Sequence, residues 1–131
     1  MFYKPHYCVV CALIEKDGKI LAAKRNKNKS EGGYWELPGG KIRENEDPQS
    51  AIIREIKEEI DLDVEVIDEL EAITYDYPDK TVLLMPFLCK GKVDNLKALE
   101  HEQIKFVDKN EIFFLNWLPP DMEILRRIFK K

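Results

Sequence analysis

The sequence is short of cysteine and histidine, with three and two of these residues among 131. A small, odd number of cysteines gives no disulfide framework and indicates a reducing compartment, so we expect a cytoplasmic protein. No apolar run approaches the roughly 20 residues that a membrane-spanning helix needs. The apolar N-terminal stretch has no small-residue cleavage site, so we expect a first strand there and not a signal peptide.

An excess of positive charge is also missing. The chain has 21 lysines and arginines against 25 aspartates and glutamates, which gives a net charge of −4. General DNA or RNA binding needs a basic surface, so we expect no nucleic-acid partner. One small anionic substrate held through a metal ion stays compatible with this charge. The length fits one domain, residues 1–131.

Cys8 and Cys11 form a C-x-x-C pair, which zinc and redox sites also show. Residues three apart on a strand lie on opposite faces, and no second cysteine pair is present to complete a zinc site. Because free cysteine is among the most buried residue types, the pattern favours buried strand cysteines.

Short β patterns and two helical patterns alternate along the chain. Asp17-Gly18 is a hairpin turn signal, and Asp47-Pro48 is an N-cap followed by proline at the first helical position. The predicted strands are 6–15, 19–25, part of 34–41, one or two within 62–77, 81–90 and 103–108. The predicted helices are 48–60, a short one after Asp108, and 119–131. This order predicts an α/β or α+β sandwich with a mixed sheet.

Carboxylates are crowded beside the helix predicted over 48–60. At about 100° per residue, the isoleucines share one arc that we expect to face the core, and three glutamates share the adjacent arc. The isoleucines are Ile52, Ile53, Ile56 and Ile60; the glutamates are Glu55, Glu58 and Glu59. Like charges at this spacing repel. The arc is therefore either a solvated flank on which Arg54 pairs with Glu58, or a site for hard divalent cations.

The frame around these glutamates favours the cation site. Gly40 is followed by five residues and Glu46, then by seven residues and Arg54-Glu55-Ile56-Lys57-Glu58-Glu59, with Leu62 closing the segment. This spacing resembles the signature of the Nudix hydrolases, here residues 40–62. One position departs from it: Asp61 stands where the family has glycine. Aspartate can adopt the left-handed conformation that this helix end needs, so we expect the loop to hold.

The resemblance covers nearly the whole chain and is to the MutT-type branch, especially its CTP pyrophosphohydrolase members. The segments "WELPGGKI", "YDYPDKTVLLMPFLCK" and "LEHEQIKFVDKNEI" carry it outside the signature. It implies the Nudix α/β/α sandwich with a mixed sheet. The implied reaction is metal-dependent cleavage of a nucleoside triphosphate, of the oxidised, modified or CTP type, to the monophosphate and pyrophosphate.

By resemblance, Glu55, Glu58 and Glu59 hold Mg²⁺, or alternatively Mn²⁺, together with the backbone carbonyl of Gly40. Glu55 could alternatively orient or deprotonate the attacking water. Arg54 is expected to orient the glutamates, and Glu46 to brace the loop through a salt bridge. Glu100 is expected to reach the metal from a late loop as ligand or base. Glu102 is its rival, and His101 is expected to be a loop residue.

Motifs identify the residues that bind the substrate less directly than those that bind the metal. Arg25 matches a family arginine that contacts the substrate, and Lys24 is a weaker candidate. Glu36, Leu37 and Tyr77 match pocket positions of the branch, and Tyr77 could stack on a base. Asp121 lies where the branch places a base-reading Asn or Asp, but it could equally be the N-cap of the last helix. Trp35 and Trp117 are expected in the core or the pocket wall.

Two other functions stay open at this point. A nucleoside-diphosphate-sugar pyrophosphatase, for example one acting on ADP-ribose, would fit a proline beyond the signature such as Pro78. A non-catalytic ligand sensor would be expected to lose the glutamates that this sequence keeps. The expected partner is a small nucleotide, with no membrane and no nucleic acid, and the chain is expected to be a monomer or a homodimer.

Overall fold

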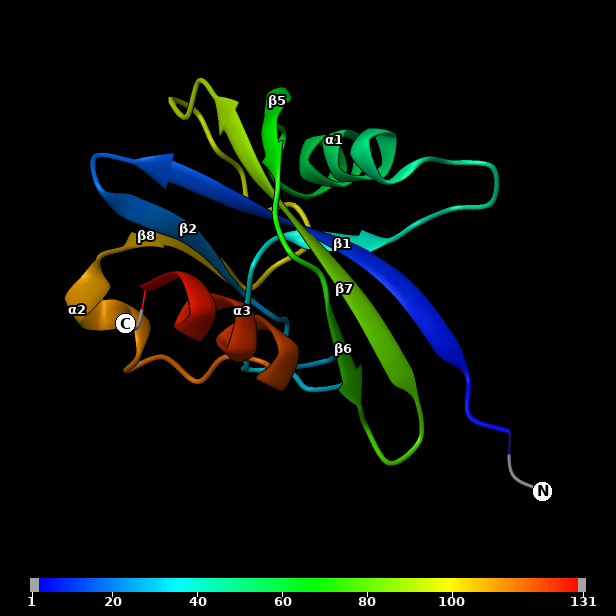
Figure 1. The fold of residues 1–131 in the computed structure, drawn as a ribbon. Helices are drawn as coiled ribbons and strands as arrows, with labels where there is room; N and C mark the ends of the chain where they lie inside the picture. Colours follow the sequence, from blue (N-terminus) through cyan, green and yellow to red (C-terminus); the bar gives the residue numbers. More distant parts are fainter. Residues whose placement is uncertain (1–2, 130–131) are drawn as a thin grey trace.

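The computed structural model describes residues 3–129 as a mixed sheet with helices on both sides (Figure 1). The strands are β1 (His6–Lys16), β2 (Lys19–Lys24), β3 (Trp35–Glu36), β4 (Gly39–Lys41), β5 (Val64–Glu69), β6 (Ile73–Asp76), β7 (Thr81–Gly91) and β8 (Gln103–Val107). The helices are α1 (Pro48–Ile60), α2 (Lys109–Ile112) and α3 (Pro119–Phe129). The last two residues of the terminal helix predicted over 119–131 lie outside the described part.

Strand β1 is the centre of the sheet. It pairs in parallel with β7 from His6 opposite Thr81 to Ile14 opposite Cys89. On its other side it pairs antiparallel with β4, and near its end with β2. The sheet is therefore mixed, as predicted, and β1 carries β4 and its glycines directly along its edge.

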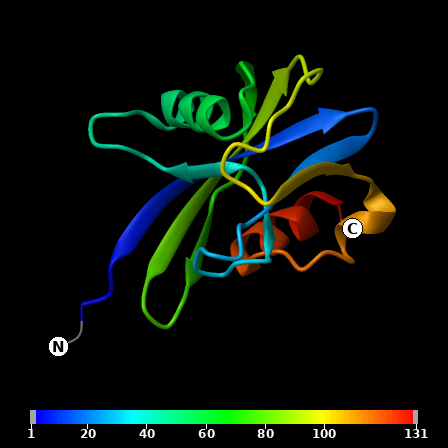
Figure 2. The same ribbon diagram turned by 180° about the vertical axis from the view of Figure 1, so that it is seen from behind.

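Alternate residues of β1 enter two separate cores. Cys11 and Leu13 pack with residues of α3 such as Leu125, whereas Val10 and Ala12 pack with residues of α1. This follows from the period of two of a strand, which points successive side chains to opposite faces. Helix α1 consequently covers one face and α3 the other, and Figure 2 shows the same layers from behind. The predicted α/β/α sandwich is confirmed.

Helix α1 begins and ends where its local signals predict. The Asp47 side chain accepts a hydrogen bond from the Ser50 backbone N–H at 2.8 Å, and Pro48 follows it. At the other end Asp61 is left-handed, with φ 55° and ψ 43°, and its N–H donates to the Lys57 carbonyl. Hydrogen bonding and charge from Lys57 lower the pKa of the Asp61 carboxylate. Asp61 thus adopts the conformation for which glycine is usual.

Two burial predictions were wrong. Cys8 is exposed, while Cys11 and Cys89 are buried, because the face of β1 that carries Cys8 is left uncovered at that end. Ile53 is 41% exposed although it belongs to the isoleucine arc of α1. It lies at the edge of that arc, beyond the reach of the sheet.

None of the helices within residues 3–129 is long and apolar enough to cross a membrane.

Candidate active site

Arg54 is the hub of the carboxylate cluster on α1. Its Nε and Nη2 donate to both oxygens of Glu46, at 2.6 and 2.7 Å. Its Nη1 donates to Glu55 at 2.8 Å and to Glu58 Oε2 at 3.2 Å. A planar guanidinium can make such a set of bonds because its five N–H groups have fixed directions. Arg54 thus pairs with Glu58, as the solvated-flank interpretation expected, but it also orders two further carboxylates.

Glu46 ties the loop before α1 to the helix. Besides Arg54, it accepts from the Arg43 backbone N–H at 3.0 Å. The hydrogen bond from Arg54, followed by that from Arg43, lowers the pKa of Glu46 to about 2. The ion pair that the resemblance implied for Glu46 is therefore present in the fold, with Arg54 as its partner.

The lowered pKa of Glu46 predicts a pH-dependent contribution to stability. A carboxylate whose pKa falls from 4.5 in the unfolded chain to about 2 in the fold stabilises the fold above pH 4.5. That contribution is lost as the pH falls towards 2. We expect Glu46→Gln to melt below the wild type at neutral pH, with the gap in Tm closing between pH 4.5 and 2. Thermal melts across this window measure it, and a gap independent of pH would contradict the prediction.

Glu59 is the buried member of the cluster. Its side chain is 3% exposed, and its Oε2 is one of the two buried side-chain atoms in residues 3–129 that have no hydrogen-bond partner. Burial, reinforced by hydrogen bonding and charge from Glu55, raises the pKa of Glu59 to about 10. An unpaired buried oxygen is costly to keep. A cation beside Glu55 and Glu59 would satisfy it.

Gly40 leaves the space that the Glu55 carboxylate fills. A Cβ at Gly40 would lie 2.5 Å from Glu55 Cδ and 2.6 Å from its Oε2. Across the described residues no three Asp, Glu, His or Cys side chains already form a metal-binding group; the guanidinium of Arg54 lies among Glu46, Glu55 and Glu58. The donor set nonetheless fits Mg²⁺ or Mn²⁺, since it consists of carboxylate oxygens with one left unsatisfied.

The late loop places Glu100 and Glu102 differently. Glu102 forms an ion pair with Lys24 at 3.2 Å. Glu100 is exposed, and its charge adds to the burial and the Glu55 interactions that raise the pKa of Glu59. Glu102 is thus paired with Lys24, whereas the charge of Glu100 acts on Glu59. Lys24, the weaker substrate candidate, is engaged by Glu102.

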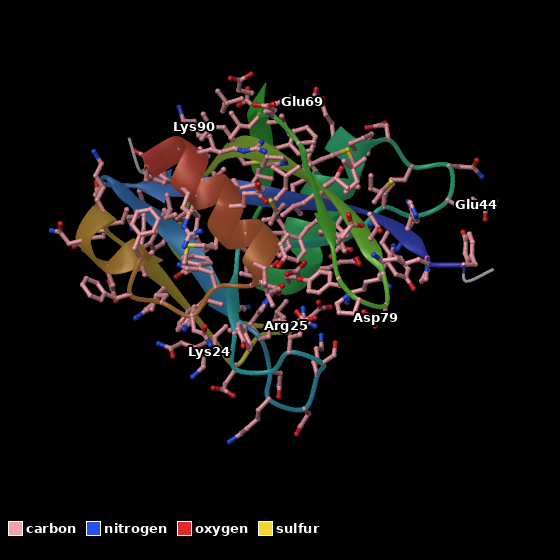
Figure 3. All side chains as sticks on the ribbon, turned by 60° about the horizontal axis from the view of Figure 1, so that its bottom comes forward. Lys24, Arg25, Glu44, Glu69, Asp79 and Lys90 are labelled. Carbon is pink, nitrogen blue, oxygen red and sulfur yellow. The ribbon has the colours of Figure 1, made fainter. Side chains whose placement is uncertain are left out.

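A cleft of about 440 Å³ adjoins the cluster at Gly40. All five residues predicted for the substrate line it: Arg25, Glu36, Leu37, Tyr77 and Asp121. Figure 3 shows Arg25 at the end of β2 facing the hairpin that carries Asp79, which lines the cleft as well. Residues that follow β2 and residues of β3, the β6–β7 hairpin and α3 thus meet at one opening.

Asp121 lies inside α3 and is not its N-cap. The helix begins at Pro119, and the Asp121 carboxylate accepts from the Leu37 backbone N–H at 2.8 Å. Burial, followed by the charge of Glu36, raises the pKa of Asp121 to about 8. The N-cap alternative was therefore wrong, because the side chain turns to the cleft wall.

Trp35 and Trp117 are buried, and the Trp117 indole donates to the Ile112 carbonyl at 2.6 Å.

His101 is a part of the site that the sequence did not reveal. The sequence predicts a loop residue, and His101 does lie in the loop between β7 and β8. Its side chain is nevertheless only 5% exposed and is hydrogen-bonded to Glu36. Glu36 in turn pairs with Arg25 at 3.1 Å. The contact joins residues 65 positions apart, so no local spacing signals it.

The chain has a mixed sheet between helices, and Arg54 orders the glutamates of α1 beside a cleft that begins at Gly40. These features fit a class of enzymes that cleave phosphoric anhydrides. The family model described as "NUDIX domain" matches residues 4–130, and the chain belongs to this family. The family generally uses divalent metal ions.

Relatives of known name agree with this placement. The chain is 39% identical over 80 residues to an 8-oxo-dGTP diphosphatase of Proteus vulgaris, covering 61% of this chain and 69% of the relative. It is 29% identical over 117 residues to a CTP pyrophosphohydrolase of Escherichia coli (strain K12), covering 89% and 87%. The crystal structure of a MutT protein from Methanosarcina mazei Go1 superposes with a TM-score of 0.83 and 28% identity, covering 100% of both chains.

Proposed function

We propose that this protein is a divalent-metal-dependent pyrophosphohydrolase that cleaves a nucleoside triphosphate to the monophosphate and pyrophosphate. The observation that carries the proposal is the junction at Gly40, which lines the cleft and lies against Glu55. A nucleotide in the cleft would therefore extend its phosphates towards the carboxylate cluster. The names of the 8-oxo-dGTP and CTP relatives support a triphosphate substrate.

The glutamates of the cluster share one proposed role, and the two arginines and Glu46 have others. Glu55, Glu58, Glu59 and Glu100, with the carbonyl of Gly40, would hold Mg²⁺, with Mn²⁺ as a substitute. The bound ions would neutralise the polyphosphate and polarise its oxygens. Arg54 would orient Glu55 and Glu58 through the bonds described above, and Glu46 would fix Arg54. Arg25, next to Glu36 in the cleft, would contact the substrate.

The reaction needs a base and a placed water molecule. Water oxygen attacks phosphorus, one anhydride P–O bond breaks, and pyrophosphate leaves. A carboxylate accepts the proton of the water, and Glu55 and Glu100 are the two candidates. Positioning and charge neutralisation would supply most of the rate enhancement in such a transfer.

The acidic wall of the cleft favours a base that presents an amino group. Asp121 and Glu36 both line it, and carboxyl oxygens accept hydrogen bonds from exocyclic amines such as that of cytosine. Tyr77, which is half-buried at the same opening, could stack on the base. We propose CTP-like or modified deoxynucleoside triphosphates as the substrate class.

Pyrophosphate release across a nucleotide panel, with magnesium and with EDTA, tests the proposed function. The panel contains the standard NTPs and dNTPs, 8-oxo-dGTP, 5-methyl-dCTP and ADP-ribose. We expect release from at least one triphosphate that disappears with EDTA. AMP from ADP-ribose with no reaction on any triphosphate would assign the protein to the sugar-nucleotide branch. No turnover at all would favour the sensor alternative.

Asp121→Asn is expected to change base selectivity by about tenfold, the effect of one good base-edge contact. With a pKa near 8, Asp121 loses its proton as the pH rises through that value. The wild-type ratio of kcat/KM between two bases should therefore shift around pH 8, whereas the Asn variant should show no shift there. Asp79→Asn, an exposed carboxylate at the same cleft, is the control. Equal pH profiles in wild type and Asp121→Asn would contradict the role.

A further inference from the structure

The loop that carries Glu100 and His101 is held by its backbone. The Lys97 N–H donates to the Ile60 carbonyl at 3.2 Å, and the Leu99 N–H to the Glu59 carbonyl at 2.9 Å. On the other side, the Glu102 N–H donates to the Lys24 carbonyl at 3.0 Å. The loop is thus fixed to the end of α1 and to β2 on both sides of His101. These backbone hydrogen bonds hold the loop in addition to any contact of the His101 side chain.

The His101 side chain makes contacts that the backbone anchors do not need. Its Nε2 lies 2.9 Å from Glu36 Oε2 and 3.6 Å from Glu59 Oε1. We assign the ring hydrogen to Nε2, because the Glu36 carboxylate beside it is an acceptor. The second oxygen of Glu36 is held by Arg25 at 3.1 Å. Glu36 is therefore clamped on both oxygens at the wall of the cleft.

Two unsatisfied atoms mark the same place. Glu59 Oε2 and His101 Nδ1 are the two buried side-chain atoms, within the described chain, that lack a hydrogen-bond partner. They belong to neighbouring side chains, of which Glu59 is 3% exposed and His101 is 5% exposed. A histidine needed only for packing could be replaced by an apolar side chain, which would avoid the cost of one such buried atom.

We propose that His101 is a positioning residue that joins the nucleotide cleft to the glutamate cluster. Through Nε2 it fixes the Glu36 carboxylate as a wall of the cleft, and it holds a donor beside Glu59 so that this carboxylate stays directed at the cation. The proposal rests on the proposed function for its substrate. Because one ring contacts both residues, its loss should affect nucleotide binding and metal binding together.

Three variants of His101 separate positioning from packing. His101→Gln keeps an amide N–H near the position of Nε2, whereas His101→Asn is too short to reach Glu36. His101→Leu fills the space without any N–H. Lys97→Ala, which removes only a surface pair with Asp61 at 3.7 Å in the same loop, is the matched control.

The first readout is Mn²⁺ binding to the nucleotide-free protein by electron paramagnetic resonance, which does not depend on turnover. We expect His101→Leu and His101→Asn to weaken Mn²⁺ binding about tenfold, the usual scale for a residue that orients a metal ligand. His101→Gln and Lys97→Ala should stay within about threefold of the wild type. KM for the preferred triphosphate should rise in the same two variants and recover in His101→Gln.

Wild-type Mn²⁺ affinity and KM in His101→Leu would overturn the proposal and leave a packing role. If His101→Leu fails to fold, as judged by its thermal melt, the Gln and Asn pair decides, and equal values in these two would overturn the proposal. A wild type that binds Mn²⁺ but releases no pyrophosphate would refute the proposed function alone, because the Mn²⁺ comparison still stands. A wild type that binds no Mn²⁺ would refute both.

Discussion

Glu58→Gln is expected to abolish turnover and to leave the fold intact. The carboxylate is 36% exposed, and its partners are Arg43 at 2.9 Å and Arg54 at 3.2 Å. Surface pairs of this kind contribute at most about 1 kcal/mol to stability. If Glu58 holds the metal as proposed, losing its charge removes several kcal/mol of transition-state stabilisation, which is at least about a hundredfold in rate. Pyrophosphate release and a thermal melt measure the two effects.

Glu44→Gln is the matched control for Glu58→Gln. Glu44 is an exposed glutamate of the loop before α1 and stands apart from Arg25 and Asp79 in Figure 3. It changes the net charge of the protein by the same amount, so it reports on any long-range effect of charge alone. Wild-type rates in Glu58→Gln would remove Glu58 from the metal site.

Gly39→Ala is expected to disrupt folding, whereas Gly40→Ala is expected to disrupt activity. A Cβ at Gly39 would lie 1.9 Å from the Val10 carbonyl oxygen and 2.7 Å from the Cys11 Cα, both backbone atoms of the central strand. Relief requires β1 or β4 to move, at a cost of about 3 kcal/mol or more. This is a large share of the roughly 5–15 kcal/mol that stabilises a typical domain.

At Gly40 the three atoms nearest to the same added methyl all belong to the end of the Glu55 side chain. That end can swing away, so Gly40→Ala should melt within a few degrees of the wild type but lose most of its rate, because Glu55 is displaced. Thermal melts and pyrophosphate release on both variants measure the contrast. Equal melting temperatures for the two variants would show that β4 is less tightly held than its pairing with β1 implies.

Local signals predicted the elements of the fold well. The bounds of α1 follow from Asp47, Pro48 and Asp61, which act within a few residues of themselves. The period of β1 predicted opposite faces for Cys8 and Cys11. It did not predict that Cys8 is exposed, because coverage depends on which elements pack over that end.

The site was predictable only where a family motif or local spacing carries it. The signature residues Glu46 and Arg54 follow from their spacing, and they contact each other within one loop and the helix that follows it. The sequence leaves two roles open for Asp121, because its partner Leu37 is 84 residues away. The bond between His101 and Glu36 is likewise a product of tertiary packing, which neither residue type nor spacing encodes.

Asp61 shows that a sequence signature can describe a backbone angle and not a residue. The family glycine marks a left-handed helix end, and this chain reaches that angle with a carboxylate that pairs with Lys57 at 3.1 Å and Lys97 at 3.7 Å. Such pairing can offset part of the roughly 1 kcal/mol that the left-handed region costs a residue other than glycine. Family searches that demand glycine here would overlook chains of this kind. A search that accepts aspartate accompanied by nearby lysines would recover them.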